Sequence, residues 1–331
     1  ALAGSEPHLA AVCDSGATAA DLLRGSLPRE GRKRKRGRVN EGAMASLREE
    51  LVALAPPPGA GVGPVTEDTF DPKADAAGPG AAEVVFTKEG GCAQTGTITV
   101  RRSGEWAVLL FDGTQQGMAR ELHPGGPADP SSLGYEYIRC MAAASAAFCD
   151  LTGRPLSAGK ERVLCVGLGS GALPAFLAHH FQSVLVDVVE LDYAVTRAVE
   201  EGLRVDLSRV VVHHDDGLVW LKKKVRNLSL LCLDPYDRNG RVPTHLTSQR
   251  FFEVCLGALG RNGVLVANLW NGPRGSEARR AVEEVCAAAV GAGFGQVFTV
   301  ALPTRASNVV MVAVVGGQAQ ALGAGLGPAG G

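Results

Sequence analysis

The chain has 331 residues, enough for one large domain or two small ones with a buried core. Its formal net charge of −1 creates no overall field that would attract nucleic acid, and no apolar run reaches the ~20 residues needed to cross a bilayer. We therefore expect neither a nucleic-acid nor a membrane partner. Apolar residues make up 46% of the chain but aromatic residues only 5%, which is typical of an α/β protein with small-residue helix packing.

The eight cysteines are scattered and form no CxxC pair. Several of them, such as Cys165 and Cys232, lie inside apolar runs that are typical of buried strands. This pattern favours free thiols in a reducing compartment over a disulfide framework or a zinc site. We therefore expect no metal and a cytoplasmic location. The chain begins at Ala1 and not at Met, so a fragment and a removed organellar targeting segment both stay open.

Residues 1–80 differ in composition from the remainder of the chain. They combine an Ala/Leu-rich start, a basic run at 32–38 and a Pro/Gly stretch around 56–58. Too little apolar surface is present there to offset chain entropy, so the sequence predicts a mostly disordered tail. The basic run is compatible with a nuclear address, with a contact to an anionic surface and with a plain solvated tail, and the sequence leaves all three open.

Short strands begin at about Val84. Segments 84–86, 96–100 and 106–111 are separated by turn residues and predict a small β-hairpin domain over residues 81–118. Its last strand ends in the turn 112–116, and apolar residues at helical spacing then predict a helix over 135–150. The exposed edges of such a hairpin favour a homodimer.

From Arg162 onward strands alternate with helices. The predicted strands cover 163–166, 184–189, 210–212, 228–233, 264–269, 296–302 and 308–315, and the predicted helices cover 174–181, 193–203, 217–225, 249–259 and 276–292. This alternation predicts a parallel sheet with helices on both faces, and the short last connection adds an antiparallel strand. The sequence therefore predicts an α/β, Rossmann-like mixed sheet over residues 130–316, followed by a flexible tail at 317–331.

Ligands of such sheets bind at the carboxyl ends of the strands. The first strand ends in Gly167-Leu168-Gly169-Ser170-Gly171, where glycines let the backbone turn sharply and approach a nucleotide. This motif is weak by itself, because Gly167, Gly169 and Ala172 also satisfy the dinucleotide-binding pattern.

Acidic residues follow the next three strands. Glu190 stands where an acid accepts both hydroxyls of a ribose, although a helix-start acid would look the same. Asp216, before Gly217, could accept the exocyclic amine of adenine, cap the next helix, or do both. Asp234 and Asp237 flank Tyr236 after a buried strand, so their carboxylates are placed to attract a cationic amine; a plain Asp-Pro turn is the alternative.

Together these motifs resemble spermidine synthase and its relatives over roughly residues 84–315. The match includes the turn 112–116 and Tyr135-Glu136-Tyr137. The resemblance implies a class I methyltransferase-like fold behind a small β-domain, in which Gln116 touches the nucleotide. It further implies that Glu190 holds the ribose and that Asp216 and Gly217 hold the adenine.

For the acceptor, the resemblance implies that Asp234 and Asp237 position and deprotonate the attacking amine. The chain departs from the family at Ser170, where aminopropyltransferases carry an Asp that pairs with the ammonium of decarboxylated S-adenosylmethionine. Losing that charged hydrogen bond costs about 1.5–3 kcal/mol, and a neutral Ser removes a barrier to the carboxylate of S-adenosylmethionine. Tyr137 also stands where the family often has Glu. The stretch 166–176 is similar to the spermidine-synthase-like half of a dual methyltransferase that acts on translation elongation factor 1A.

The leading hypothesis is therefore methyl transfer from S-adenosylmethionine to an amine on a small molecule or a protein. In that reaction Asp234 orients or deprotonates the amine, while Asp237 or Tyr236 shapes the acceptor pocket. The runner-up is aminopropyl transfer from decarboxylated S-adenosylmethionine to a diamine in polyamine biosynthesis. A third hypothesis is a nucleotide-binding scaffold that has lost catalysis.

Overall fold

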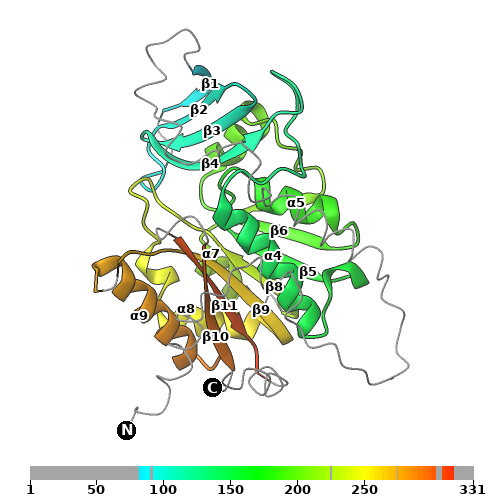
Figure 1. Ribbon diagram of the computed structural model, residues 1–331, viewed down its shortest axis with the longest axis vertical. Helices are drawn as coiled ribbons and strands as arrows, with labels where there is room; N and C mark the ends of the chain where they lie inside the picture. Colours follow the sequence, from blue (N-terminus) through cyan, green and yellow to red (C-terminus); the bar gives the residue numbers. More distant parts are fainter. Residues whose placement is uncertain (1–81, 90–91, 224–225, 274, 303–307, 317–331) are drawn as a thin grey trace, which may run out of the picture.

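A computed structural model describes residues 82–89, 92–223, 226–273, 275–302 and 308–316. The predicted tails at 1–80 and 317–331, including the basic run at 32–38, lie outside the described residues. Within the described part a small sheet lies at one end of a larger, helix-covered sheet (Figure 1).

The small sheet is an antiparallel meander in the order β1-β2-β3-β4. Its strands are β1 (Glu83–Lys88), β2 (Ile98–Ser103), β3 (Trp106–Phe111) and β4 (Thr114–Arg120). The sequence did not predict β4, because Thr114–Arg120 is polar and lacks clear alternation. Asp112 and Gly113 have positive φ angles of 46° and 85°, which suits a tight two-residue hairpin turn. That turn carries the chain directly from β3 into β4, so Gln116 lies on a strand and not in a turn.

The small sheet packs on a helical segment of the larger unit. This segment consists of α6 (Tyr193–Arg197) and the π-helical turn η2 (Ala198–Gly202). A Cβ at Gly202 would lie 2.7 Å from Val100 and 2.9 Å from Phe86, so the two units approach closely here. This contact fixes the small sheet over one edge of the large sheet.

The large sheet has seven strands in the order β10-β11-β9-β8-β5-β6-β7. They are β5 (Arg162–Val166), β6 (Leu185–Glu190), β7 (Val210–His214), β8 (Leu228–Leu233), β9 (Leu259–Trp270), β10 (Gln296–Ala301) and β11 (Asn308–Val314). The strands from β9 to β7 pair in parallel, while β11 is antiparallel to both β9 and β10. The predicted mixed sheet is therefore confirmed.

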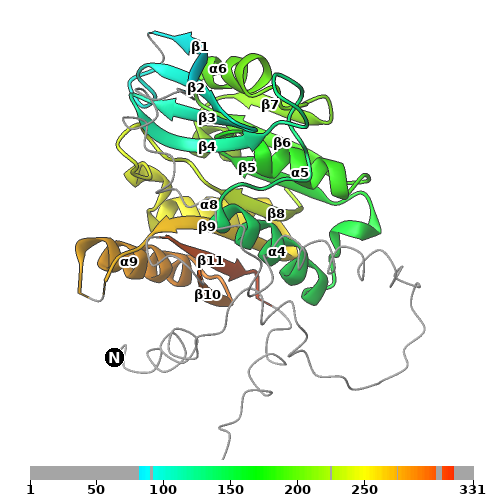
Figure 2. The same ribbon diagram turned by 45° about the horizontal axis from the view of Figure 1, so that its top comes forward.

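Helices cover both faces of this sheet (Figures 1 and 2). One layer holds α4 (Glu136–Leu151), α5 (Ala172–His180) and α6. The other layer holds α7 (Gly217–Lys222), α8 (Gln249–Ala258) and α9 (Glu277–Gly291). Two short 3-10 turns, η1 (Leu156–Ala158) and η3 (Thr244–Leu246), lie in the connections between these elements. Along β5, Val163 and Cys165 pack into the first layer, whereas Leu164 and Val166 pack into the second. Both faces of the strand are thus apolar, as expected for a buried parallel strand.

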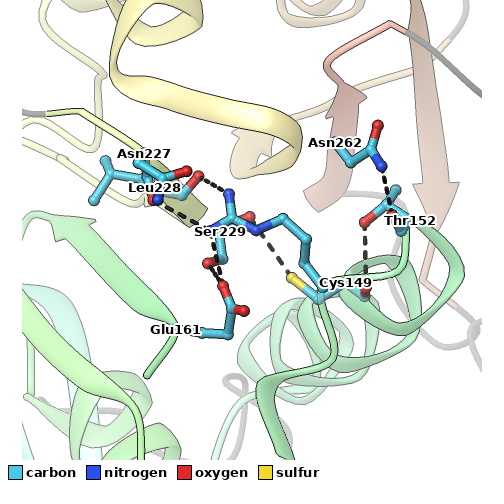
Figure 3. Close-up of polar contacts among 8 residues, drawn as sticks. Cys149, Thr152, Glu161, Asn227, Leu228, Ser229 and Asn262 are labelled. Carbon is cyan, nitrogen blue, oxygen red and sulfur yellow. Dashed lines mark hydrogen bonds and ion pairs between the residues drawn. The ribbon is translucent and has the colours of Figure 1, made fainter. Parts of the chain in front are cut away.

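A polar cluster ties the end of α4 to the starts of the strands (Figure 3). Arg154 donates to the carbonyl of Leu228 at 2.9 Å and pairs with Glu161 at 2.8 Å. Asn262 donates to the carbonyl of Thr152 at 2.9 Å. Because the cluster holds the carboxyl end of α4, it also fixes where the amino end of that helix presents its tyrosines.

Seven cysteines belong to the described residues, and all of them are free thiols. Cys92 is half-buried and the other six are buried, and Cys165 lies beside Cys232 across the β5–β8 pair. Among the helices that the structure describes, none combines the length and apolarity needed to cross a membrane.

Candidate functional site

A cavity of about 530 Å³ lies at the carboxyl ends of the parallel strands. Its volume falls within the roughly 300–1,000 Å³ range of small-molecule sites. Loops after β6 and β7 line one half, which we call the β6–β7 side, and residues of β9 and β11 line the other, the β9–β11 side. The loops after β5 and β8 lie between them, and β4 with the start of α4 forms the facing wall.

The glycine loop after β5 adopts the left-handed backbone that the motif predicts. Gly167, Gly169 and Gly171 have φ angles of 92°, 52° and 74°. A Cβ at Gly167 would lie 2.7 Å from the backbone oxygen of Asp234, so this glycine lets the loops after β5 and β8 meet. Gly167 and Gly169 line the cavity, whereas Gly171 caps α5 and packs against Val199.

Ser170 lies behind the cavity and not in its main volume. Its side chain is buried under Gly117 of β4, where a Cβ would come within 2.7 Å of the Ser170 Oγ. Ser170 lines a recess of about 20 Å³, which also touches Gln116, Tyr137 and Asp234. The recess has room for about one water-sized group.

Glu190 ends β6 and faces the β6–β7 side. Its carboxylate accepts the backbone N–H groups of Leu168 and Asp192, each at 2.9 Å. These bonds fix the carboxylate between two loops, while burial raises its pKa. Each carboxylate oxygen can accept more than one hydrogen bond, so Glu190 is able to hold two neighbouring hydroxyls of a ligand.

Asp216 begins α7 on the same side. Its Oδ1 accepts the N–H groups of Leu218 and Val219, each at 3.0 Å, which confirms the predicted helix cap. Its Oδ2 lies 2.8 Å from the Nε2 of His245. Gly217 follows directly, and both residues line the cavity. Contact of Asp216 with an adenine amine stays a prediction.

Asp234 lies at the centre of the cavity, directly after β8. Its Oδ1 accepts a hydrogen bond from Asn268 at 2.9 Å, and its Oδ2 accepts one from the hydroxyl of Tyr137 at 3.4 Å. Burial raises its pKa from 3.8 to about 6, against these two hydrogen bonds, which lower it. The titratable groups that interact with it include the phenols of Tyr137 and Tyr236 and the thiol of Cys165. A carboxylate in this state is ionised at neutral pH and ready to accept a proton.

A second amide stands behind Asn268. Asn308 of β11 donates to the Oδ1 of Asn268 at 3.0 Å, and both amides are buried. Because Oδ1 is taken, Asn268 presents its NH₂ group to Asp234. Neither residue was predicted from the sequence, although an amide inside the apolar run 264–269 was a usable signal, since buried polar groups need partners.

Tyr236 and Asp237 have structural contacts of their own. The Tyr236 hydroxyl donates to the carbonyl of Asn268 at 3.2 Å, and burial raises the pKa of this phenol above its usual range. The Oδ1 of Asp237 accepts the N–H groups of Asn239 and Arg241, each at 2.9 Å. Asp237 therefore lines the cavity but uses its carboxylate to close its own turn. Its predicted role in catalysis has no support from these contacts.

The wall opposite the sheet comes from the small domain and α4. Gln116 of β4 donates to the backbone carbonyl of Asp237 at 3.3 Å, and the N–H of Arg238 donates to the carbonyl of Gln94 at 2.7 Å. The rings of Tyr135 and Tyr137 stack with centroids 5.7 Å apart. The loop after β8 is thus held against the small sheet, which encloses the cavity.

The cavity lining is strongly acidic. The described lining residues include five carboxylates and one histidine but no lysine or arginine: Glu190, Asp215, Asp216, Asp234, Asp237 and His245. Such a lining favours a cationic ligand. Within the described residues, no group of three or more His, Cys, Asp or Glu side chains is placed to hold a metal ion.

No model of a known protein family matches the chain. Two similar curated proteins are polyamine aminopropyltransferases. The protein from Vibrio vulnificus is 27% identical over 170 residues, covering 50% of this chain and 54% of the relative. The protein from Chromobacterium violaceum is 29% identical over 176 residues, covering 49% of this chain and 62% of the relative. The match thus spans less than two thirds of either relative.

Solved structures share the fold. A probable spermidine synthase from Corynebacterium glutamicum gives a TM-score of 0.58 at 18% identity, covering 70% of this chain and 80% of that one. Spermidine synthase from Thermotoga maritima gives a TM-score of 0.50 at 18% identity, covering 70% and 73%. At this identity the likeness establishes the fold, which is the Rossmann-like class that the sequence predicted.

Proposed function

Because the chain is spermidine synthase-like in sequence and in fold, we propose that it transfers an aminopropyl group from decarboxylated S-adenosylmethionine to an amine. The amine nitrogen attacks the carbon beside the sulfonium, the carbon–sulfur bond breaks and its electrons stay on sulfur. The nitrogen loses one proton, which Asp234 is placed to accept. The products are an aminopropylated amine and a neutral thioether nucleoside.

The negative charge of the cavity lining favours decarboxylated S-adenosylmethionine over the intact form as the donor. Decarboxylated S-adenosylmethionine is wholly cationic in its sulfonium and ammonium groups, whereas the intact cofactor adds a carboxylate. The described lining offers five carboxylates and no lysine or arginine, so a ligand carboxylate would meet several like charges and find neither of these cations as a partner. The 20 Å³ recess beside Ser170 also fits a single ammonium better than a branched amino-acid head.

The remaining lining residues fit the nucleoside part of this donor. Two observations support this fit. The loop at Gly167 has no room for a Cβ, and the carboxylates of Glu190 and Asp216 supply hydrogen-bond acceptors. We propose that Glu190 binds the ribose hydroxyls and that Asp216 with Gly217 binds the adenine. Gly167 and Gly169 would then contact the donor from the loop after β5, and Gln116 would contact it from the facing wall. When bound, the donor supplies the electrophilic carbon.

Methyl transfer, the first hypothesis from the sequence, is not confirmed, and the curated relatives favour the runner-up. One observation keeps methyl transfer as the second candidate. Ser170 is neutral, so among the described residues that line the recess Asp234 is the only acid that could pair with the ammonium of the decarboxylated donor. The deciding measurement is calorimetric titration with both donors. Tighter binding of intact S-adenosylmethionine would replace the proposal with methyl transfer.

Changing Ser170 to Asp should tighten binding of the decarboxylated donor by about tenfold and weaken binding of intact S-adenosylmethionine, because the recess gains an anion. Titration calorimetry of each variant with each donor measures the change. Ser170→Asn is the matched control, since it has nearly the same shape without the charge. An equal effect of Asp and Asn on both donors would show that Ser170 does not face the charged end of the donor.

A further inference from the structure

The two halves of the cavity differ in charge. Three of the five carboxylates follow β6 and β7, on the side assigned to the nucleoside. On the β9–β11 side, the two strands contribute Asn268, Trp270 and Asn308, all neutral. The facing wall adds Tyr135 and further uncharged side chains of β4. Among the described residues, the side left for the acceptor therefore carries no acid on its strands.

Two carboxylates follow β8, between the halves, and they are not equivalent. The Oδ1 of Asp237 accepts hydrogen bonds from two backbone N–H groups of its own turn. Its Oδ2 lies 3.4 Å from the side-chain amide nitrogen of Asn239. Within the described part of the chain, Asp234 pairs with no cationic side chain and is held by a neutral amide and a phenol. Of these two carboxylates, Asp234 is the one that is not engaged by its own turn, and we assign the attacking amine to it.

We propose that the acceptor is a small primary amine with one positive charge and an uncharged, largely apolar remainder, and not a diamine. This inference rests on the proposed transfer reaction. Asp234 is already used by the attacking nitrogen, which arrives protonated and must lose a proton to react. The second ammonium of a diamine would lie among the neutral side chains of β9 and β11, where it would be partly desolvated and would find no carboxylate on these strands.

Trp270 gives this half its apolar surface. It ends β9, is 54% exposed and lines the cavity beside Asn308, its register partner on β11. An aliphatic chain that extends from Asp234 toward this ring would bury apolar area on it. A carboxylate at this position would give the second ammonium of a diamine a counter-charge.

A matched pair of acceptors tests the inference. With decarboxylated S-adenosylmethionine as donor, we expect kcat/KM to be at least about tenfold higher for 1-aminobutane than for 1,4-diaminobutane at the same pH. Mass spectrometry of the aminopropylated products provides the readout. A preference for the diamine overturns the inference while leaving the proposed transfer intact.

Trp270→Glu supplies the missing carboxylate and should raise kcat/KM for 1,4-diaminobutane about tenfold relative to 1-aminobutane. Trp270→Gln is the control, because it removes the ring without adding charge. An equal shift in both variants would mean that loss of the ring, and not the charge, sets the preference, and this too would overturn the inference.

Failure of the proposed function gives a different result. If neither amine yields product, calorimetric binding of both amines in the presence of the thioether nucleoside still reports the charge preference. Tighter binding of 1-aminobutane supports the inference without turnover. Tighter binding of the diamine, or binding of neither amine, contradicts it.

Discussion

Replacing Asp234 with Asn should lower kcat by about 10²–10⁴-fold while donor affinity changes by less than about threefold. The Asn side chain keeps the shape and can still accept from Asn268, but it cannot take a proton from the attacking amine. Single-turnover rates and donor calorimetry on the same preparation measure the two effects. Full activity in this variant would assign proton transfer to water or to the product amine, and equal loss of binding would point to a structural role.

The same variant should unfold at a higher temperature at neutral pH. Burial raises the pKa of Asp234 from 3.8 to about 6, so between these values the folded state binds more protons than the unfolded state. Stability therefore falls as pH rises through this window, and the ionised carboxylate costs about 3 kcal/mol above it. The difference in Tm between Asp234→Asn and wild type should be small near pH 4 and widen toward pH 7. A constant difference would mean that Asp234 titrates normally.

The sequence could predict the positions along the sheet edge but not the directions of the side chains. Alternating strands and helices predict the fold, and parallel strands bring Glu190, Asp216 and Asp234 to one edge whatever the details of packing. Asp237 is an example of a residue whose position could be predicted but whose hydrogen bonds could not. Its spacing from Asp234 suggests a catalytic pair, yet the following Asn239 and Arg241 offer backbone donors that capture its carboxylate. Local hydrogen bonding thus engages one oxygen of this acid, and its predicted role in catalysis stays a prediction.

Sequence patterns also could not predict which distant segments contact one another. Strand β4 is polar, and its place depends on pairing with β3 and on the close approach of Gly117 to Ser170. Asn268 and Asn308 lie 34 and 74 positions after Asp234 in the sequence, and only the antiparallel β9–β11 pair brings them together. An isolated amide in an apolar strand indicates a buried partner, but it does not say which residue that partner is.

Removing Asn268 should move the pH dependence of the reaction. Asn268→Ala deletes a hydrogen bond that lowers the pKa of Asp234, so we expect that pKa to rise from about 6 by about one pH unit. Because the ionised carboxylate is the active form, kcat/KM should then fall about fivefold at pH 6 and hardly at all at pH 8.5.

A variant of the second amide, Asn308, provides a control for this prediction. Asn308→Ala should shift the acid limb of the pH profile in the same direction but by less, because Asn268 keeps its place on β9 and only loses the contact that fixes its orientation. Asn239→Ala, which removes a cavity amide that contacts Asp237 instead, should leave the limb near its wild-type position. The carboxyl ¹³C resonance of Asp234, assigned by its absence from Asp234→Asn, reports the same pKa without turnover. An unshifted resonance in Asn268→Ala would show that the amide pair only packs against Asp234, whereas a graded shift across the two variants would identify it as the device that keeps this carboxylate ionised at neutral pH.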